Sequence, residues 1–159
     1  AFGSEPPAAM TPNPPQSAPP DAPAPRQFGL VHAVKVANDG TVYVADRTYR
    51  RLQTFTLDGK FVRDVPLRAD GPVAPVPAGF AFSPDPQQRY LYVVDSGPMR
   101  VLIFDRATLT QVGVVGMRGA GPGEFDIVHH MAADSQGSLY TAEIVTNRRA
   151  QRFVLESPR

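Results

Sequence analysis

The feature of this sequence that most constrains its fold is a motif that returns three times at nearly constant spacing. Each copy has a tyrosine, a carboxylate three positions later, and an arginine that opens a short run ending in phenylalanine. The tyrosines are Tyr43, Tyr92 and Tyr140, so successive copies lie 49 and 48 positions apart. A repeat of this length is typical of one supersecondary unit that stacks against its neighbours, because a single unit cannot bury its apolar surface alone.

Each repeat divides into four short runs that favour β-strands. In the first repeat these runs cover residues 31–37, 41–46, 51–57 and 60–65. The runs are rich in β-branched and aromatic residues, and Asp39-Gly40 and Asp58-Gly59 are typical of hairpin turns. No window shows a helical period. Four-stranded units at this period are the blades of a β-propeller, so we expect an all-β fold with three blades, about 28–75, 76–115 and 116–159.

The third copy carries the clearest family resemblance. It has a glycine-rich stretch from Gly116 to Phe125, then His129, and then the turn Asp134-Ser-Gln-Gly137 before its tyrosine. These residues resemble an NHL repeat, and the resemblance covers all three copies, about residues 28–155. NHL propellers usually have six blades and often act as binding scaffolds. The resemblance therefore implies half of a ring, completed by missing N-terminal blades or by a second copy, that presents its rim or channel to a protein or small ligand.

The N-terminal part of the chain differs from the repeats. Nine of the 18 prolines lie between Pro6 and Pro25, which is typical of extended chain without a core of its own. Ala1-Phe2-Gly3 resembles Val114-Val115-Gly116, the end of an outer strand. We expect residues 1–27 to be the end of a preceding blade followed by a loop or linker, and a loop of that length could also shape a ligand pocket. At the other end, the third repeat stops before a fourth strand.

Composition excludes several classes of function. The net charge of +1 is too small for a dedicated nucleic-acid binder. The longest apolar runs are about five residues, so the sequence predicts no membrane span. The chain has no cysteine, which excludes disulfides, thiolate metal sites and cysteine catalysis but leaves the compartment open. Similar bacterial NHL proteins are often exported, so the resemblance implies a periplasmic or extracellular location.

His32 and His129 are the first candidates for chemistry. They stand at matching positions, four residues after Phe28 and Phe125, where the innermost strand of each blade begins. Blades one and three of a six-bladed ring are about 120° apart, so these side chains could converge on the central axis. Imidazole is a common zinc ligand, and three protein ligands with an open position make a catalytic zinc site. The alternative is that each histidine bonds neighbouring backbone at a blade junction.

A second family resemblance bears on these histidines. Peptidyl-hydroxyglycine amidating lyases resemble this chain in placing histidines after a Phe-x-x-Pro step, where they bind a channel metal. This resemblance implies a lyase or hydrolase dependent on Zn or another divalent metal, as the alternative to a binding scaffold. The chain departs from that pattern because Val31 and Val128 replace the proline and Ala78 replaces a third histidine. His130 is expected on the opposite face of the strand from His129, as a packing or hydrogen-bonding residue.

A carboxylate and an arginine flank the central hairpin of every repeat. The pairs are Asp46 with Arg51, Asp95 with Arg100, and Glu143 with Arg149. Such groups can pair across a turn, and a device present in every repeat is expected to be structural, because an active site would occur once. Other residues near these turns could form a basic rim for an anionic ligand or a solvated rim with local ion pairs. They are Arg47, Tyr49, Arg50 and Arg148, together with Arg51, Arg149 and Arg152.

Overall fold

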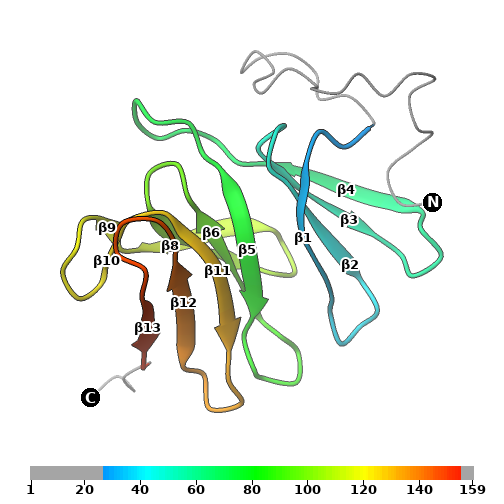
Figure 1. Ribbon diagram of the computed structural model, residues 1–159. Helices are drawn as coiled ribbons and strands as arrows, with labels where there is room; N and C mark the ends of the chain where they lie inside the picture. Colours follow the sequence, from blue (N-terminus) through cyan, green and yellow to red (C-terminus); the bar gives the residue numbers. More distant parts are fainter. Residues whose placement is uncertain (1–26, 155–159) are drawn as a thin grey trace.

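The computed structural model describes residues 27–154, and within this range it contains thirteen β-strands and no helix (Figure 1). The expectations for residues 1–26, a preceding blade end and a proline-rich linker, lie outside the described residues. Because every described element is a strand, this part of the chain has no helix that could cross a membrane. The all-β fold class expected from the repeat is therefore what the structure shows.

Eleven of the thirteen strands form three antiparallel sheets that follow one another along the chain. The first sheet contains β1 (Val31–Val36), β2 (Val42–Asp46), β3 (Arg51–Phe55) and β4 (Phe61–Pro66). The second contains β5 (Pro77–Phe82), β6 (Tyr90–Asp95), β7 (Arg100–Asp105) and β8 (Thr110–Val115). The third has β11 (Val128–Ala133), β12 (Leu139–Glu143) and β13 (Ala150–Phe153). Each sheet is one blade, and the expected strands of the first repeat agree with those observed to within two residues.

The blades pack face to face, and alternating side chains of each strand point to opposite neighbours. In blade one, Tyr43, Ala45 and Leu52 face blade two and join its Phe80 and Leu91 in one buried cluster. A second buried cluster joins blades two and three. It contains Tyr92, Val94, Val101, Val128, Met131 and Leu139. Blade two is therefore covered on both faces, as expected for a unit inside a stack.

A short linker carries the chain from the outer strand of blade two to the inner strand of blade three. It contains a two-stranded parallel ribbon, β9 (Met117–Arg118) with β10 (Glu124–Phe125). Gly116 and Gly123 adopt φ values of +83° and +79°, which favour glycine. A Cβ at Gly116 would also lie 2.2 Å from the Phe125 ring. Glycine here lets the linker turn tightly and leaves room for Phe125 in the core.

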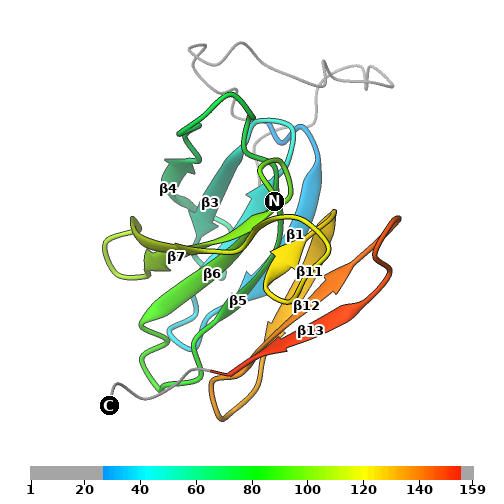
Figure 2. The ribbon, with the colours of Figure 1, turned by 90° about the vertical axis from the view of Figure 1, so that its left-hand side faces the viewer.

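The inner strands β1, β5 and β11 lie side by side, with β5 in the middle (Figures 1 and 2). Each has a register irregularity near its start, and in β1 and β11 this falls at the histidine. The backbones of β5 and β11 approach closely at Gly79, where an added Cβ would lie 2.8 Å from the Cα of His130. Glycine at this position therefore lets blade three pack tightly against blade two.

Candidate functional site

The three histidines of the chain form one group where the inner strands begin, which we call the inner histidine cluster (His32, His129 and His130). The Nε2 atoms of His32 and His129 are 3.2 Å apart, although the residues are 97 positions apart in the sequence. The ring of His130 lies 4.7 Å from that of His129 and 5.8 Å from that of His32. Blades one and three thus bring two imidazoles into contact beside blade two, whose residue at the matching position is Ala78.

The surroundings of His32 and His129 favour their neutral forms. Burial lowers the pKa of His32 below its ordinary value, and His129, Arg47 and His130 lower it further. Burial also lowers the pKa of His129, with His130 and Arg47 acting in the same direction. Nδ1 of His32 is buried and has no hydrogen-bond partner of good geometry among the described residues. The nearby Ala78 backbone acts in the opposite direction to burial and raises the pKa of His32, but it does not cancel the decrease. His32 and His129 therefore offer neutral imidazole nitrogens beside the Arg47 guanidinium.

The expectation that His130 lies on the opposite face of the strand from His129 is wrong, although its ring does pack against the other two histidines. In a regular strand, His129 and His130 would point to opposite faces. The pairing of β11 with β12 shifts register between Val128 and His130, so His129 is the extra residue of a bulge. A bulge breaks the two-residue alternation and re-aims side chains, so both rings lie in the same group. The sequence contains no turn residue or proline that marks this bulge.

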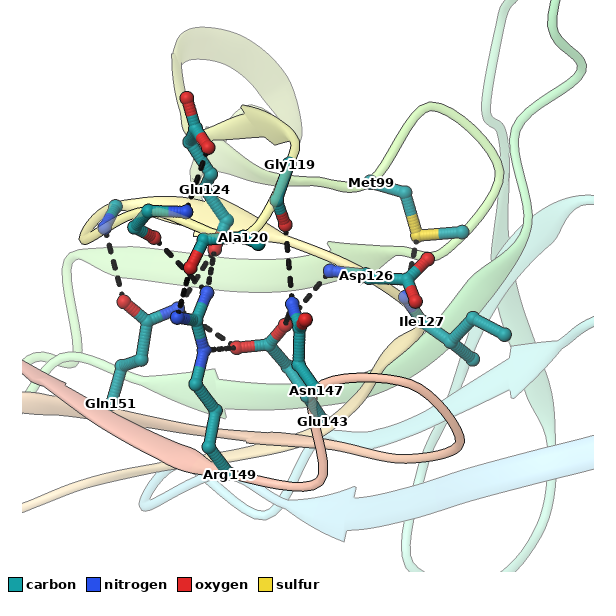
Figure 3. Close-up of polar contacts among 12 residues, drawn as sticks. Met99, Gly119, Ala120, Glu124, Asp126, Ile127, Glu143, Asn147, Arg149 and Gln151 are labelled. Carbon is teal, nitrogen blue, oxygen red and sulfur yellow. Dashed lines mark hydrogen bonds and ion pairs between the residues drawn. The ribbon is translucent and has the colours of Figure 1, made fainter.

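The carboxylate–arginine pair of blade three holds the incoming linker in place (Figure 3). Arg149 donates from Nε to Glu143 at 2.7 Å, and its other nitrogens reach linker carbonyls. These carbonyls belong to Ala120, Gly121 and Glu124, at 2.5, 3.0 and 2.8 Å. Glu143 in turn accepts hydrogen bonds of 2.8 Å from the Asp126 N–H, Asn147 and Gln151. We call each such pair with its linker contacts a clamp.

Blades one and two have clamps of the same design. In blade one, Arg51 contacts Asp46 at 3.2 Å and donates to the Gln27 carbonyl, while Asp46 accepts from the Gly29 N–H. In blade two, Asp95 accepts from the Val76 N–H at 2.7 Å and from Arg100 at 3.1 Å, and Arg100 also pairs with Asp70. All three carboxylates have fully buried side chains. Because the clamp recurs in every blade and joins the hairpin to the incoming linker, its geometry is that of a structural device.

Sequence reasoning anticipated the pairing within each clamp and missed the linker contacts. It also missed Asn147 and Gln151, which complete the shell around Glu143. A signal existed at Gln151, because a glutamine within a strand that packs on a core needs hydrogen-bond partners. The linker carbonyls gave no signal, since every residue has one.

The residues predicted to form a basic rim make different individual contacts. Arg47 lies close enough to the inner histidine cluster to lower the pKa values of His32 and His129. The Tyr49 ring lies 5.3 Å from the Arg51 guanidinium, and Arg148 bonds the Val145 carbonyl. Arg50 and Arg148 occupy left-handed turn positions, with φ of 53° and 45°. Among these residues, Arg47 is the one the structure brings to the histidines.

The prediction that Arg152 lies near the turn with the other arginines is wrong. Arg152 donates to the Ser138 hydroxyl and lies over the Tyr140 ring, at the opposite end of β13 from the turn. Arg152 lies three residues beyond Arg149, and each strand residue advances the chain by about 3.3 Å, so its side chain is carried away from the turn.

Comparison with solved structures identifies the fold. A Bacteroides uniformis protein provisionally described as a 6-phosphogluconolactonase matches 79% of this chain with a TM-score of 0.60 and 18% identity. Virginiamycin B lyase from Staphylococcus aureus matches 80% with a TM-score of 0.52 and 15% identity. Dihydro-heme d1 dehydrogenase NirN matches 81% with a TM-score of 0.55 and 19% identity. The described chain is part of a β-propeller.

This propeller segment has no match among protein-family models or curated protein sequences. It spans 37%, 42% and 29% of the three structures above, so each of them is much longer than the segment. Identities below 20% show a shared fold, and propellers host many unrelated activities. The function of this segment must therefore be argued from its own residues.

Proposed function

We propose that this chain is part of an NHL-type, six-bladed propeller scaffold that binds an anionic group of a ligand at the inner histidine cluster. The contact between His32 and His129 at 3.2 Å carries the proposal, because it joins two blades at their inner strands. In a propeller, each blade contributes one inner strand to a common axis, so side chains at matching positions of these strands can come close together. The three blades and their clamps supply rigidity, and the histidines supply donors and acceptors.

The charge around the cluster favours an anionic group. Arg47 lies near both His32 and His129, and the other group that lowers the pKa of His129 is His130, a second base. A carboxylate or phosphate would accept hydrogen bonds from the imidazole N–H groups and from the guanidinium. Its charge would raise the lowered pKa values of the histidines, so binding is expected to take up protons.

A divalent metal is the second candidate, and one distance favours it. Two nitrogens bound to a tetrahedral Zn²⁺ at 2.0–2.1 Å lie about 3.3 Å apart, close to the observed 3.2 Å. Neutral imidazoles are also ready to bind without losing a proton. Within the described residues, however, no group of three His, Asp or Glu side chains could hold a metal ion. A lyase or hydrolase of this kind would need at least one further ligand from outside residues 27–154.

Calorimetric titrations with inorganic phosphate and with Zn²⁺ between pH 5.5 and 8 test both candidates. For an anion site, phosphate affinity falls as pH rises and drops at least tenfold in Arg47→Ala. Arg148→Ala is the matched control, because Arg148 bonds a carbonyl of its own turn. For a metal site, Zn²⁺ affinity rises with pH, and metal content falls in His32→Ala and His129→Ala. Binding of neither probe, or binding unchanged in all these variants, would contradict both candidates.

A further inference from the structure

The residue that follows each clamp carboxylate holds the same backbone position in all three blades. These residues are Arg47, Ser96 and Ile144. Each donates its N–H to the carbonyl of the residue directly before the inner strand of its own blade, at 2.9, 2.9 and 3.1 Å. The backbone at this position is therefore constant, whereas the side chain differs from blade to blade. A side chain at this position can take a role of its own without disturbing the blade.

In blade two, the side chain at this position reaches across the seam to blade three. The Ser96 hydroxyl donates a hydrogen bond to the backbone carbonyl of Val128, the residue directly before His129. Val128 is fully buried, so water does not reach this carbonyl. In blade one, by contrast, the Arg47 guanidinium makes no hydrogen bond or ion pair within residues 27–154. The same position thus carries a free charge in blade one and a bond to blade three in blade two.

The pairing of β11 with β12 shows why the Val128 carbonyl takes a partner from another blade. Val128 lies opposite Glu143 in this pairing. The adjacent ladder bond runs from the Ile144 N–H to the Ile127 carbonyl, so it lies beside the pair and not within it. In such a pair, the N–H and C=O groups point away from the neighbouring strand. A buried carbonyl that points away from its ladder needs a donor from elsewhere, and Ser96 supplies it.

This carbonyl belongs to the peptide at which the bulge begins. His129 is the extra residue of the bulge, and its ring contacts His32 of blade one. A bulge re-aims side chains because it changes the orientation of the peptides that flank the extra residue. A donor fixed on blade two holds the peptide between Val128 and His129 in one orientation. Without that donor, the buried carbonyl turns towards another partner, and the direction of the His129 side chain changes with it.

We infer that Ser96 is a positioning residue of the inner histidine cluster, which acts through the Val128 carbonyl to aim the His129 ring at His32. Its consequence for ligand binding rests on the proposed function, whereas its effect on the two rings does not. The repeat then divides the work between matching positions. Arg47 supplies charge to the ligand, and Ser96 fixes the geometry of the histidines without touching the ligand.

Ser96→Val and Ser96→Thr test this inference in the whole chain, because the two new side chains have nearly the same shape and differ in the hydroxyl. The ring centroids of His32 and His129 are 4.6 Å apart, so nuclear Overhauser effects should connect their ring protons in the original protein and in Ser96→Thr. In Ser96→Val these effects should disappear, and phosphate affinity should fall about fivefold or more. Ser83→Ala is the matched control. It removes a part-buried hydroxyl from the other end of the same blade and should change neither measurement.

One measurement on the original protein does not depend on how the variants fold. A hydroxyl bonded to a buried carbonyl exchanges its proton slowly with water, so the Ser96 hydroxyl proton should be observable at low temperature. A freely exchanging hydroxyl overturns the inference, as do equal ring contacts in Ser96→Val and Ser96→Thr. An intact ring contact in Ser96→Val overturns it even if the free energy of unfolding falls, because the bond then only fastens two blades. If the rings separate in Ser96→Val but phosphate binding is absent or unchanged, this inference stands and the proposed function fails.

Discussion

The clamps of blades two and three use the same chemistry with opposite electrostatic results. Burial raises the pKa of Asp95, and the Val76 N–H and Arg100 only partly offset it. Burial also acts to raise the pKa of Glu143, but Arg149 and three further donors lower it to about 2. Those donors are the Asp126 N–H, Asn147 and Gln151. Four donors bond Glu143 and three bond Asp95, which is also the more deeply buried of the two, so donor number and burial together account for the opposite pKa shifts.

Glu143→Gln is expected to have the largest effect on this comparison. The pKa of Glu143 lies near 2 in the fold against 4.5 ordinarily, so its charged form is worth about 3 kcal/mol of folding stability at pH 7. A glutamine amide has one oxygen, so it can accept either from Arg149 and Gln151 or from the Asp126 N–H and Asn147. Two of the four bonds and the charge are lost, and the stability is lost with them. Urea denaturation measures the difference. Asp58→Asn is the control, because Asp58 pairs with Lys60 at an exposed turn, and it should leave stability unchanged; equal losses in the two variants would contradict the argument.

The two clamps also predict opposite pH dependence. Because the pKa of Glu143 is lowered, its contribution is complete above about pH 4.5 and disappears as the pH falls towards 2. The pKa of Asp95 is raised, so the folded chain takes up this proton before the unfolded chain does, and acidification through that range stabilises the fold. Unfolding free energies between pH 6 and pH 2 should therefore fall less steeply in Glu143→Gln and more steeply in Asp95→Asn than in the original protein. Parallel curves for all three proteins would show that these carboxylates do not differ.

The fold could be predicted from the sequence, but the difference between the clamps of blades two and three could not. Period, strand composition and turn glycines are local properties, so they predicted blades and the approximate ends of the strands. The approach of His32 to His129 followed from the same repeat, because matching positions in stacked blades converge. The bulge at His129, which brings in His130, depends on pairing with β12 and has no local signature. The shell around Glu143 likewise depends on how the linker folds back over the hairpin.

Arg149→Lys is expected to have an intermediate effect. The guanidinium of Arg149 bonds Glu143 and three linker carbonyls at once, and a lysine ammonium cannot reproduce that planar fork. We expect a loss of about 1–2 kcal/mol, because a few net hydrogen bonds disappear while the charge remains. Denaturant unfolding of Arg149→Lys beside Arg100→Lys tests this. Arg100 contacts two carboxylates, Asp95 and Asp70, and a lysine ammonium can still pair with both. Arg100→Lys should therefore lose less stability than Arg149→Lys. A larger loss in Arg100→Lys would reverse the proposed ranking.

Asp95→Asn is expected to have the smallest effect at pH 7, within about 1 kcal/mol of the original protein. Its raised pKa means that burial disfavours the charge, so removing the charge relieves a desolvation penalty while it weakens the pair with Arg100. The amide oxygen still accepts from the Val76 N–H, and Arg100 keeps Asp70 as its partner. Urea denaturation beside Glu143→Gln makes the comparison direct. If both variants lose the same stability, the number of donors does not explain the difference between the two clamps. If Asp95→Asn leaves stability unchanged, the carboxylate of blade two serves to fix the position of the linker more than to stabilise the fold.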